Sequence, residues 1–401
     1  MPGDEPEPVG CRLLLQGIPG IKQGSRLFYK DQQAFWLSYG FTQLPADACV
    51  FFRINSAGLS IVGVHVDDLL AAVPSDEVWS EIVTAIRTKF PLADKGNAAL
   101  FLGIDIKQSA DRHTVTLSQR RSIEDLLERA NMVNCNPALT PCVAGFVWTK
   151  QDCPKVPLAA HPDMPNYRGL AALANFIARW TRGEASFTVH NCCKYMSNPG
   201  DKHVAALKRL LRYFAGTKDH GLVYTRSVKA TPISPLGLHG ATDSSHMDCV
   251  DSSRSTVAFV FFLDECAVSW YSKLHGYVTT CSNHSEYAAL FVGSKEAFYL
   301  VSWLKPLQEV LQLQLEPAPI YLDNDGAKAL SQDPVGTFKN KHVRMAHHFT
   351  QELVTSGVIK TLHIATGDNC ADVLTKSLGP TTFPLHAFRL AEDTVKAHAP
   401  R

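Results

Sequence analysis

The sequence lacks the features that mark several protein classes. Its 39 Lys and Arg nearly balance 38 Asp and Glu, giving a net charge of +1, so any nucleic-acid surface would have to be a local basic patch. The 11 cysteines are scattered without a CxxC pair, which fits free thiols in a reducing compartment better than disulfides or a zinc site. No apolar run approaches the ~18–20 residues that span a bilayer. We therefore expect an intracellular protein, cytoplasmic or nuclear, that is neither secreted nor bound to a membrane.

The remaining composition is ordinary for a globular chain. With 45% hydrophobic and 19% charged residues over 401 positions, it can form about two or three domains with a full core. Residues 1–10 are acidic and rich in proline, unlike a signal or transit peptide, and we expect them to be disordered. Residues 136–165 are rich in proline without periodicity, which indicates a linker.

Four carboxylates between residues 241 and 376 lie at the ends of expected elements. Asp243 follows an apolar run, Glu286 lies in the first turn of a long apolar helix, Asp323 ends a short strand, and Asp372 opens a final helix. Acids in the order strand, helix, strand, helix can gather around two Mg²⁺ ions roughly 3.5–4 Å apart, which activate a water and stabilise the leaving oxygen of a phosphodiester. We predict that these four residues are catalytic metal ligands, with Mn²⁺ as a possible substitute.

Each of these acids also has a structural interpretation. Asn283 and Glu286 have the spacing of a capping box, and Asn369 with Asp372 could form a shorter cap. Asp323 opens an Asp-Asn-Asp-Gly run that is typical of a turn. Caps and turns explain each acid taken singly, but they explain four in this order much less well.

The sequence around these acids resembles the ribonuclease H domain of copia-type retrotransposon Pol polyproteins. That family places a carboxylate after the first strand, a second in an Ala-Glu-Tyr-like helix start, a third in Asp-Asn, and a fourth in Ala-Asp-x-Leu-Thr-Lys. The matching residues are Asp243, Ser285-Glu286-Tyr287, Asp323-Asn324 and Ala371-Asp372-Val373-Leu374-Thr375-Lys376. The resemblance implies a ribonuclease H-like domain with a mixed five-stranded sheet and flanking helices. It also implies Mg²⁺-dependent hydrolysis of the RNA strand of RNA–DNA hybrids.

The first half carries an acidic pair between two apolar stretches. Asp67 and Asp68 separate residues 59–66 from residues 69–73, a pattern that is often only a turn. It also resembles the metal-binding hairpin of the family's reverse transcriptase. Residues 20–41 have a helical apolar stripe and resemble a GLKQ-x-x-R segment near the bound nucleotide and template in that enzyme. The polar positions that match this segment are Lys22, Gln23 and Arg26.

Two further stretches carry basic residues on expected helices, and they resemble the family's thumb and connection regions. Either basic face could contact phosphates or simply be solvated. We expect RNA–DNA hybrid or other nucleic acid as partner, with other Pol chains as a further possibility and no membrane. The candidate nucleic-acid-binding residues are Arg120 and Arg121 in the expected helix 119–131, and Lys208, Arg209 and Arg212 in the helical segment 201–224.

These observations predict an α/β (α+β) chain in which a partial reverse-transcriptase palm and thumb precede a ribonuclease H-like domain. The expected parts are a disordered start (1–10), a truncated palm and thumb (11–135), a linker with connection helices (136–230), the ribonuclease H-like domain (235–378) and a tail (379–401).

The resemblance to a polymerase is incomplete. A palm needs a further aspartate on a strand before residue 20, where the chain offers only Asp4, Glu5 and Glu7. We therefore expect no polymerase activity from this chain alone. The ribonuclease H-like part departs from the family near its acids, for example at His342-Val343-Arg344. A catalytically decayed or co-opted remnant that only binds nucleic acid therefore stays open as the alternative.

Overall fold

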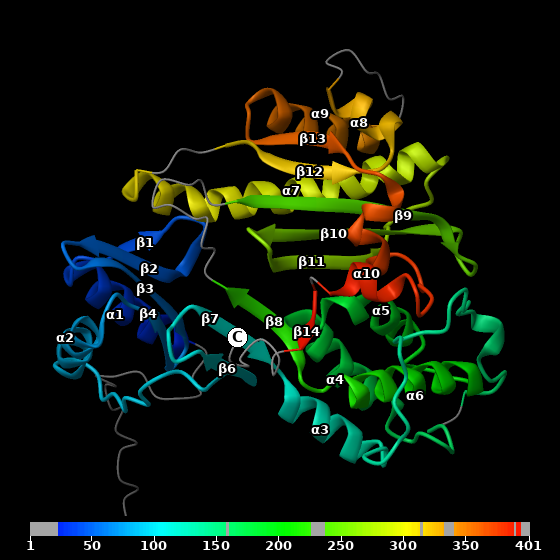
Figure 1. Cartoon of the computed structure of the whole chain (residues 1–401), viewed down its shortest axis with the longest axis horizontal. Helices are drawn as coiled ribbons and strands as arrows, with labels where there is room; N and C mark the ends of the chain where they lie inside the picture. The colour runs from blue at the N-terminus through cyan, green and yellow to red at the C-terminus, as the bar shows by residue number, and fades with distance from the viewer. Residues whose placement is uncertain are drawn as a thin grey trace, which may run out of the picture. The chain divides into compact units, whose positions relative to one another are not determined.

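The computed structural model describes residues 23–157, 160–225, 237–312, 316–332, 341–388 and 390–393, and it gives only the backbone over 341–347. Residues 1–10 and Lys22 lie outside these ranges. The chain forms two compact units, Met1–Lys95 and Gly96–Arg401 (Figure 1). The domain boundaries expected from the sequence are finer than this division and stay a prediction. Within the described ranges, no helix has the length and apolar character needed to cross a bilayer.

The first unit is a four-stranded antiparallel sheet with two helices. Its elements are α1 (Gly24–Ser38), β1 (Thr42–Leu44), β2 (Asp47–Asn55), β3 (Gly58–His65), β4 (Asp68–Ala72) and α2 (Asp76–Arg87). The strand order is β1-β2-β3-β4. Val62 and Val64 alternate into the core beside Trp36 of α1, as the period of two in a strand requires. The predicted amphipathic helix and acidic hairpin are both confirmed.

The second unit contains an antiparallel sheet beside a group of helices. The strands are β5 (Leu100–Phe101), β6 (Ile104–Gln108), β7 (Thr114–Ser118), β8 (His220–Thr225) and β14 (Glu392–Asp393), in the order β14-β8-β7-β6-β5. The helices are α3 (Arg120–Arg129), α4 (Tyr167–Trp180), α5 (Ser186–Lys194) and α6 (Asp201–Gly216). Leu126, Leu170 and Leu207 are fully buried in one core that these helices share.

Two expectations for this region are wrong. The helical segment expected over 201–224 ends at Gly216, and its last residues form β8, which pairs with β7. Helix α5 was not predicted, because its sequence SFTVHNCCK contains mainly weak helix formers. Burial of Phe187 and Val189 stabilises it instead. The proline-rich segment has little regular structure, yet its Trp148 packs against Phe187.

A mixed five-stranded sheet forms the rest of the second unit, as predicted. Its strands are β9 (Leu238–Cys249), β10 (Arg254–Leu263), β11 (Cys266–Leu274), β12 (Ala318–Leu322) and β13 (Ile359–His363), in the order β11-β10-β9-β12-β13. The first three form an antiparallel meander, and β12 runs parallel to both β9 and β13. Asp243 was expected to follow the first strand of this sheet. It lies instead near the middle of β9, which extends to Cys249.

Helices and short turns complete this part of the fold. They are α7 (Ser282–Val310), α8 (Asp325–Gln332), α9 (Lys341–Thr355), η3 (Thr366–Asp368), η4 (Cys370–Leu374) and α10 (Phe383–Ala387). Helix α7 lies against β9 and β10 (Figure 1). A proline inside a helix predicts a break near Pro306, but α7 continues to Val310. Pro306 lacks the N–H that would bond the carbonyl four residues back, and burial of Leu307 and Gln308 holds the last turn.

Candidate metal centre

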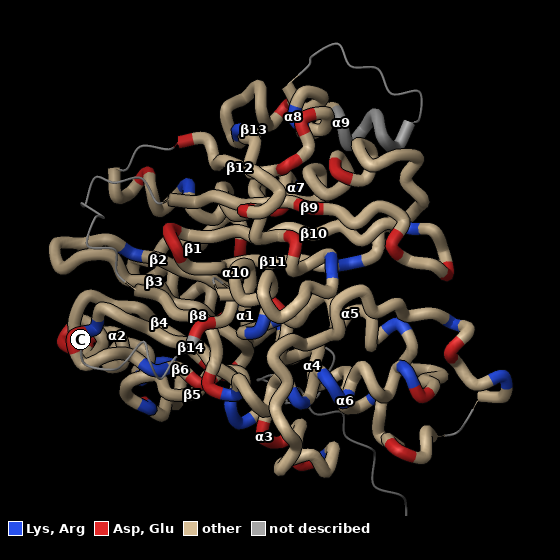
Figure 2. Tube along the Cα trace, turned by 45° about the vertical axis from the view of Figure 1, so that its right-hand side comes forward, with Lys and Arg blue, Asp and Glu red and all other residues tan. Residues whose placement is uncertain are grey.

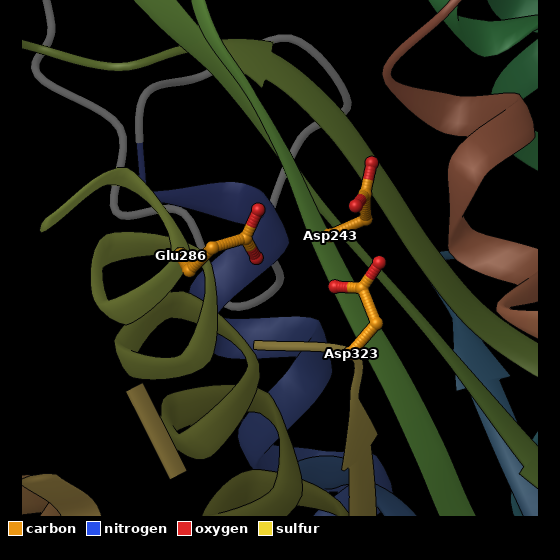
Figure 3. A group of neighbouring side chains, drawn as sticks. All are labelled: Asp243, Glu286 and Asp323. Atoms are coloured by element: carbon orange, nitrogen blue, oxygen red, sulfur yellow. The ribbon is translucent and has the colours of Figure 1, made fainter. Parts of the chain in front are cut away.

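Three of the four predicted acids come together at one end of the mixed sheet. Asp243, Glu286 and Asp323 each offer a carboxylate oxygen, and these oxygens all lie within 4.8 Å of one another. The three side chains point toward one another from β9, from the start of α7 and from the end of β12 (Figure 3). Asp243 and Glu286 are buried, with 1% and 8% of their surface exposed, whereas Asp323 is half-buried.

The register of the sheet places the two aspartates. Strand β12 pairs in parallel with β9, with Tyr321 opposite Ala241. Two residues further along each strand, Asp323 therefore reaches the level of Asp243. Parallel neighbours point corresponding side chains to the same face, so the two carboxylates converge.

Close packing of α7 on β9 places Glu286 next to the two aspartates, from the face of β9 that Thr242 and Ser244 share. A Cβ at Gly293 would lie 2.6 Å from Cγ2 of Thr242, so only glycine allows the helix to approach the strand this closely. Glu286 precedes Gly293 by about two helical turns and so lies on the same side of α7. The Ser244 hydroxyl donates to Oε1 of Glu286 at 2.9 Å.

The alternative explanation of Glu286 as part of a capping box is wrong. Helix α7 begins at Ser282, and its N-cap is Cys281, with no side-chain capping bond. Glu286 is therefore one turn inside the helix, with its carboxylate directed into the acidic group (Figure 3). Among the described residues none donates a hydrogen bond to its buried Oε2.

Burial and mutual repulsion make the ionised acids unfavourable. Burial raises the pKa of Asp243 to about 7, and Lys376 offsets part of that rise. Burial also raises the pKa of Glu286 to about 8, and the neighbouring Asp243 raises it further. Carboxylates that share a site and lack compensating charge hold protons in this way.

The donor set fits a divalent cation. Carboxylate oxygens are the ligands that Mg²⁺ and Mn²⁺ prefer in proteins. The buried Oε2 of Glu286, which has no donor among the described residues, is an acceptor that a cation would satisfy. A bound cation would also remove the repulsion that raises the two pKa values.

Asp372 lies outside this group of three, although it is close to it. It is buried in η4, a 3-10 turn, whereas a final α-helix was expected. Asn369 caps this turn by accepting from the Ala371 N–H, as one alternative suggested, and its Nδ2 donates to the carbonyl of Thr242 at 3.0 Å. The turn is thereby fixed to β9 directly beside Asp243.

Two residues directly after η4 that were not predicted as site residues engage the acids. The Thr375 hydroxyl donates to Oδ2 of Asp243. Nζ of Lys376 lies 2.9 Å from Oδ1 of Asp372 and 3.5 Å from Oδ2 of Asp243. The signal for both was present, because they complete the Leu-Thr-Lys motif.

The acids of the first unit are arranged differently. Asp67 and Asp68 lie exposed at the tip of the β3–β4 hairpin, where Gln32 Nε2 donates to the carbonyl of Val66 at 3.1 Å. Over the described ranges, neither aspartate belongs to a group of three or more side chains able to hold a metal. The predicted nucleic-acid residues Gln23 and Arg26 are exposed at the start of α1.

The predicted basic residues of the second unit all have partners within the chain. Helix α3 carries both Arg and acidic residues, whereas α6 carries Lys and Arg with a single acid, Asp201, at its start (Figure 2). Contact with phosphate would have to replace these partners. The pairs are Arg120 with Glu124 and Asp219, Arg121 with Asp105, Lys208 with Asp163, Arg209 with Thr140, and Arg212 with the carbonyl of Asn136.

Comparison with known proteins agrees with the motifs. Residues 3–144 match the family described as reverse transcriptase (RNA-dependent DNA polymerase). The chain is 32% identical over 381 residues to "Retrovirus-related Pol polyprotein from transposon RE2" of Arabidopsis thaliana, covering 95% of this chain and 25% of that protein. It is 31% identical over 396 residues to the RE1 counterpart from the same plant, covering 98% of this chain and 25% of that protein. The chain thus spans about a quarter of the length of these curated relatives.

Two solved structures are similar over part of the chain. Ribonuclease H1 from the archaeon Halobacterium salinarum matches with 14% identity and a TM-score of 0.25, covering 40% of this chain and 98% of that one. LC11-RNase H1 in complex with an RNA/DNA hybrid matches with 18% identity and a TM-score of 0.24, covering 34% and 92%. Scores this low carry no argument about the fold or activity of this chain.

Proposed function

The chain belongs to the Pol polyproteins of copia-type retrotransposons, and from this membership we propose that it hydrolyses the RNA strand of RNA–DNA hybrids. The observation that carries the proposal is the convergence of Asp243, Glu286 and Asp323, with a buried Glu286 oxygen that has no donor among the described residues. Three carboxylates in contact are costly in a folded protein unless a cation neutralises them.

Each residue has a defined part in this proposal. Asp243, Glu286 and Asp323 would hold Mg²⁺, and Ser244 orients Glu286 through its hydrogen bond to Oε1. A divalent cation held there supplies a water of lowered pKa and charge that stabilises the leaving oxygen. Asp372 stays beside the group, with its carboxylate engaged by Lys376.

The proposed substrate is a hybrid duplex, which proteins recognise by its A-like shape and its 2′-hydroxyl groups. The basic faces that contain Arg120, Arg121, Lys208, Arg209 and Arg212 would contact its phosphates, in exchange for their partners within the chain. This contribution would be independent of sequence and sensitive to salt.

The proposal is tested by cleavage of a labelled RNA–DNA hybrid with MgCl₂ and with EDTA. Replacing Asp323 by Asn is expected to reduce cleavage more than ~100-fold, because several kcal/mol of charge stabilisation are lost with a metal ligand. The matched control is Asp325→Asn, since Asp325 is exposed and pairs only at the surface with His363. Hybrid binding without Mg²⁺-dependent cleavage by the native chain would instead favour a remnant that only binds nucleic acid.

A further inference from the structure

The acid site has two sides with different charge balance. On one side, Asp243, Glu286 and Asp323 form the group of three carboxylates, and Oε2 of Glu286 has no donor among the described residues. On the other side, between Asp243 and Asp372, the ammonium of Lys376 contacts both carboxylates. A cation position is therefore already filled on the second side by the protein itself.

The ammonium is held there by the local fold. Lys376 follows Asp372 by four residues, and its Nζ lies 2.9 Å from Oδ1 of that residue. Asn369 ties the turn to the carbonyl of Thr242, which precedes Asp243 in β9. Because both contacts are 2.9–3.0 Å long and Asn369 and Asp372 are buried, the lysine reaches Asp243 from a fixed turn.

Charge and hydrogen bonding on this side are both satisfied. Oδ2 of Asp243 accepts from the Thr375 hydroxyl and lies 3.5 Å from Nζ of Lys376. A divalent ion between Asp243 and Asp372 would have to displace the ammonium from both carboxylates, against the repulsion of like charges at short range. Among the described residues, no cationic side chain contacts the unpaired oxygen of Glu286.

We infer that Lys376 takes the place of a second metal ion, so that this centre binds one divalent cation, at Asp243, Glu286 and Asp323. The inference rests on the proposed function, because it concerns the number of cations at the same site. It differs from the two-ion arrangement expected from the sequence. Lys376 is then a positioning residue that holds Asp372 and one face of Asp243 in place of a metal.

The test counts bound ions with Mn²⁺ alone as probe. The full chain is titrated with Mn²⁺ up to about 1 mM, the weak end of protein cation sites, and free Mn²⁺ is followed by electron paramagnetic resonance. The native chain is expected to bind one ion. Lys376→Met, which keeps the stem but removes the charge, is expected to bind two. Lys376→Arg, which keeps the charge, is expected to bind one.

Further variants assign the ions to their sites. Asp372→Asn is expected to leave the single ion of the native chain in place, and to remove the second ion from the Lys376→Met chain. Asp243→Asn is expected to abolish binding in both backgrounds. Circular dichroism identifies variants that do not fold, and Lys376→Gln replaces Lys376→Met in that case.

The outcomes separate the inference from the function on which it rests. Two ions in the native chain, or one ion in a folded Lys376→Met or Lys376→Gln chain, would overturn the role of Lys376 and leave the proposed function standing. A native chain that binds no Mn²⁺ would overturn both. One ion in the native chain and two in the charge-removing variant would establish the role of Lys376.

Discussion

Replacing Asp243 by Asn is expected to stabilise the metal-free protein at pH 8. The side chain is buried, and burial raises its pKa from 3.8 to about 7. Each pKa unit corresponds to about 1.4 kcal/mol, so keeping this carboxylate ionised in the fold costs about 4 kcal/mol. That pKa already includes the attraction to Lys376, so Asn removes this net cost. Asn can still accept from the Thr375 hydroxyl, but it brings an amide NH₂ group into the buried site in place of a carboxyl oxygen. We expect a net gain of about 2 kcal/mol in the free energy of unfolding.

The pH dependence follows from the same shift. The folded protein holds the protons of Asp243 and Glu286 up to about pH 7 and 8, whereas the unfolded chain releases them near their ordinary values of 3.8 and 4.5. Between these limits the unfolded chain binds fewer protons, so stability falls as the pH rises from about 4 to about 8. The Asn variant should lose much of this slope and match the native chain near pH 3.

The assay is urea unfolding in EDTA at several pH values, repeated with Mg²⁺. The native chain should gain stability with Mg²⁺, by about 2.7 kcal/mol at 100 times the dissociation constant, whereas Asp243→Asn should not. Asp325→Asn serves as the exposed control and should behave like the native chain, because a surface ion pair contributes little. An Asp243→Asn chain clearly less stable than the native one at pH 8 in EDTA would refute the reasoning.

Three further outcomes are expected. Gly293→Ala should lower the free energy of unfolding by about 1–3 kcal/mol, because its Cβ would meet Thr242 at 2.6 Å, and equal urea midpoints would contradict the close packing of α7. Charge reversal of Lys208 and Arg209 together should reduce the slope of log affinity against log salt for hybrid duplex by about two; an unchanged slope would make them a solvated face. The purified chain should not extend a primer with Mg²⁺ or Mn²⁺ and all four nucleotides, because over the described ranges Asp67 lies in no group of three metal-capable side chains, and extension that depends on Asp67 would contradict this.

The parts of the fold that were predictable have local signals. The apolar stretches 59–66 and 69–73 on either side of Asp67 and Asp68 predicted the acidic hairpin that β3 and β4 form. The convergence of Asp243, Glu286 and Asp323 was expected from motif order, because the two aspartates lie on or directly after neighbouring strands and Glu286 lies in the helix that packs on them. Local patterns of this kind can be recognised in the sequence without knowledge of the tertiary contacts.

The parts that were not predictable depend on packing between distant segments. The pairing of β14 with β8 joins residues about 170 apart, and two-residue strands leave no periodic signal. Asp372 was expected to join the other acids, but its carboxylate pairs with Lys376 instead. The position of this pair depends on the hydrogen bond by which Asn369 fixes η4 to β9. Such a contact is set by tertiary structure rather than by propensity.

The shared core of the second unit has a consequence for modularity. Ile123 of α3, Val260 of β10 and the fully buried Leu390 pack in the same hydrophobic cluster, and Trp270 Nε1 donates to the carbonyl of Ala178 at 2.9 Å. A fragment that begins at β9 would therefore carry an uncovered apolar face where the helices pack, and such faces favour aggregation. The mixed five-stranded sheet therefore does not form a separable module: recombination or proteolysis that separates it from α3–α6 would divide a single hydrophobic core.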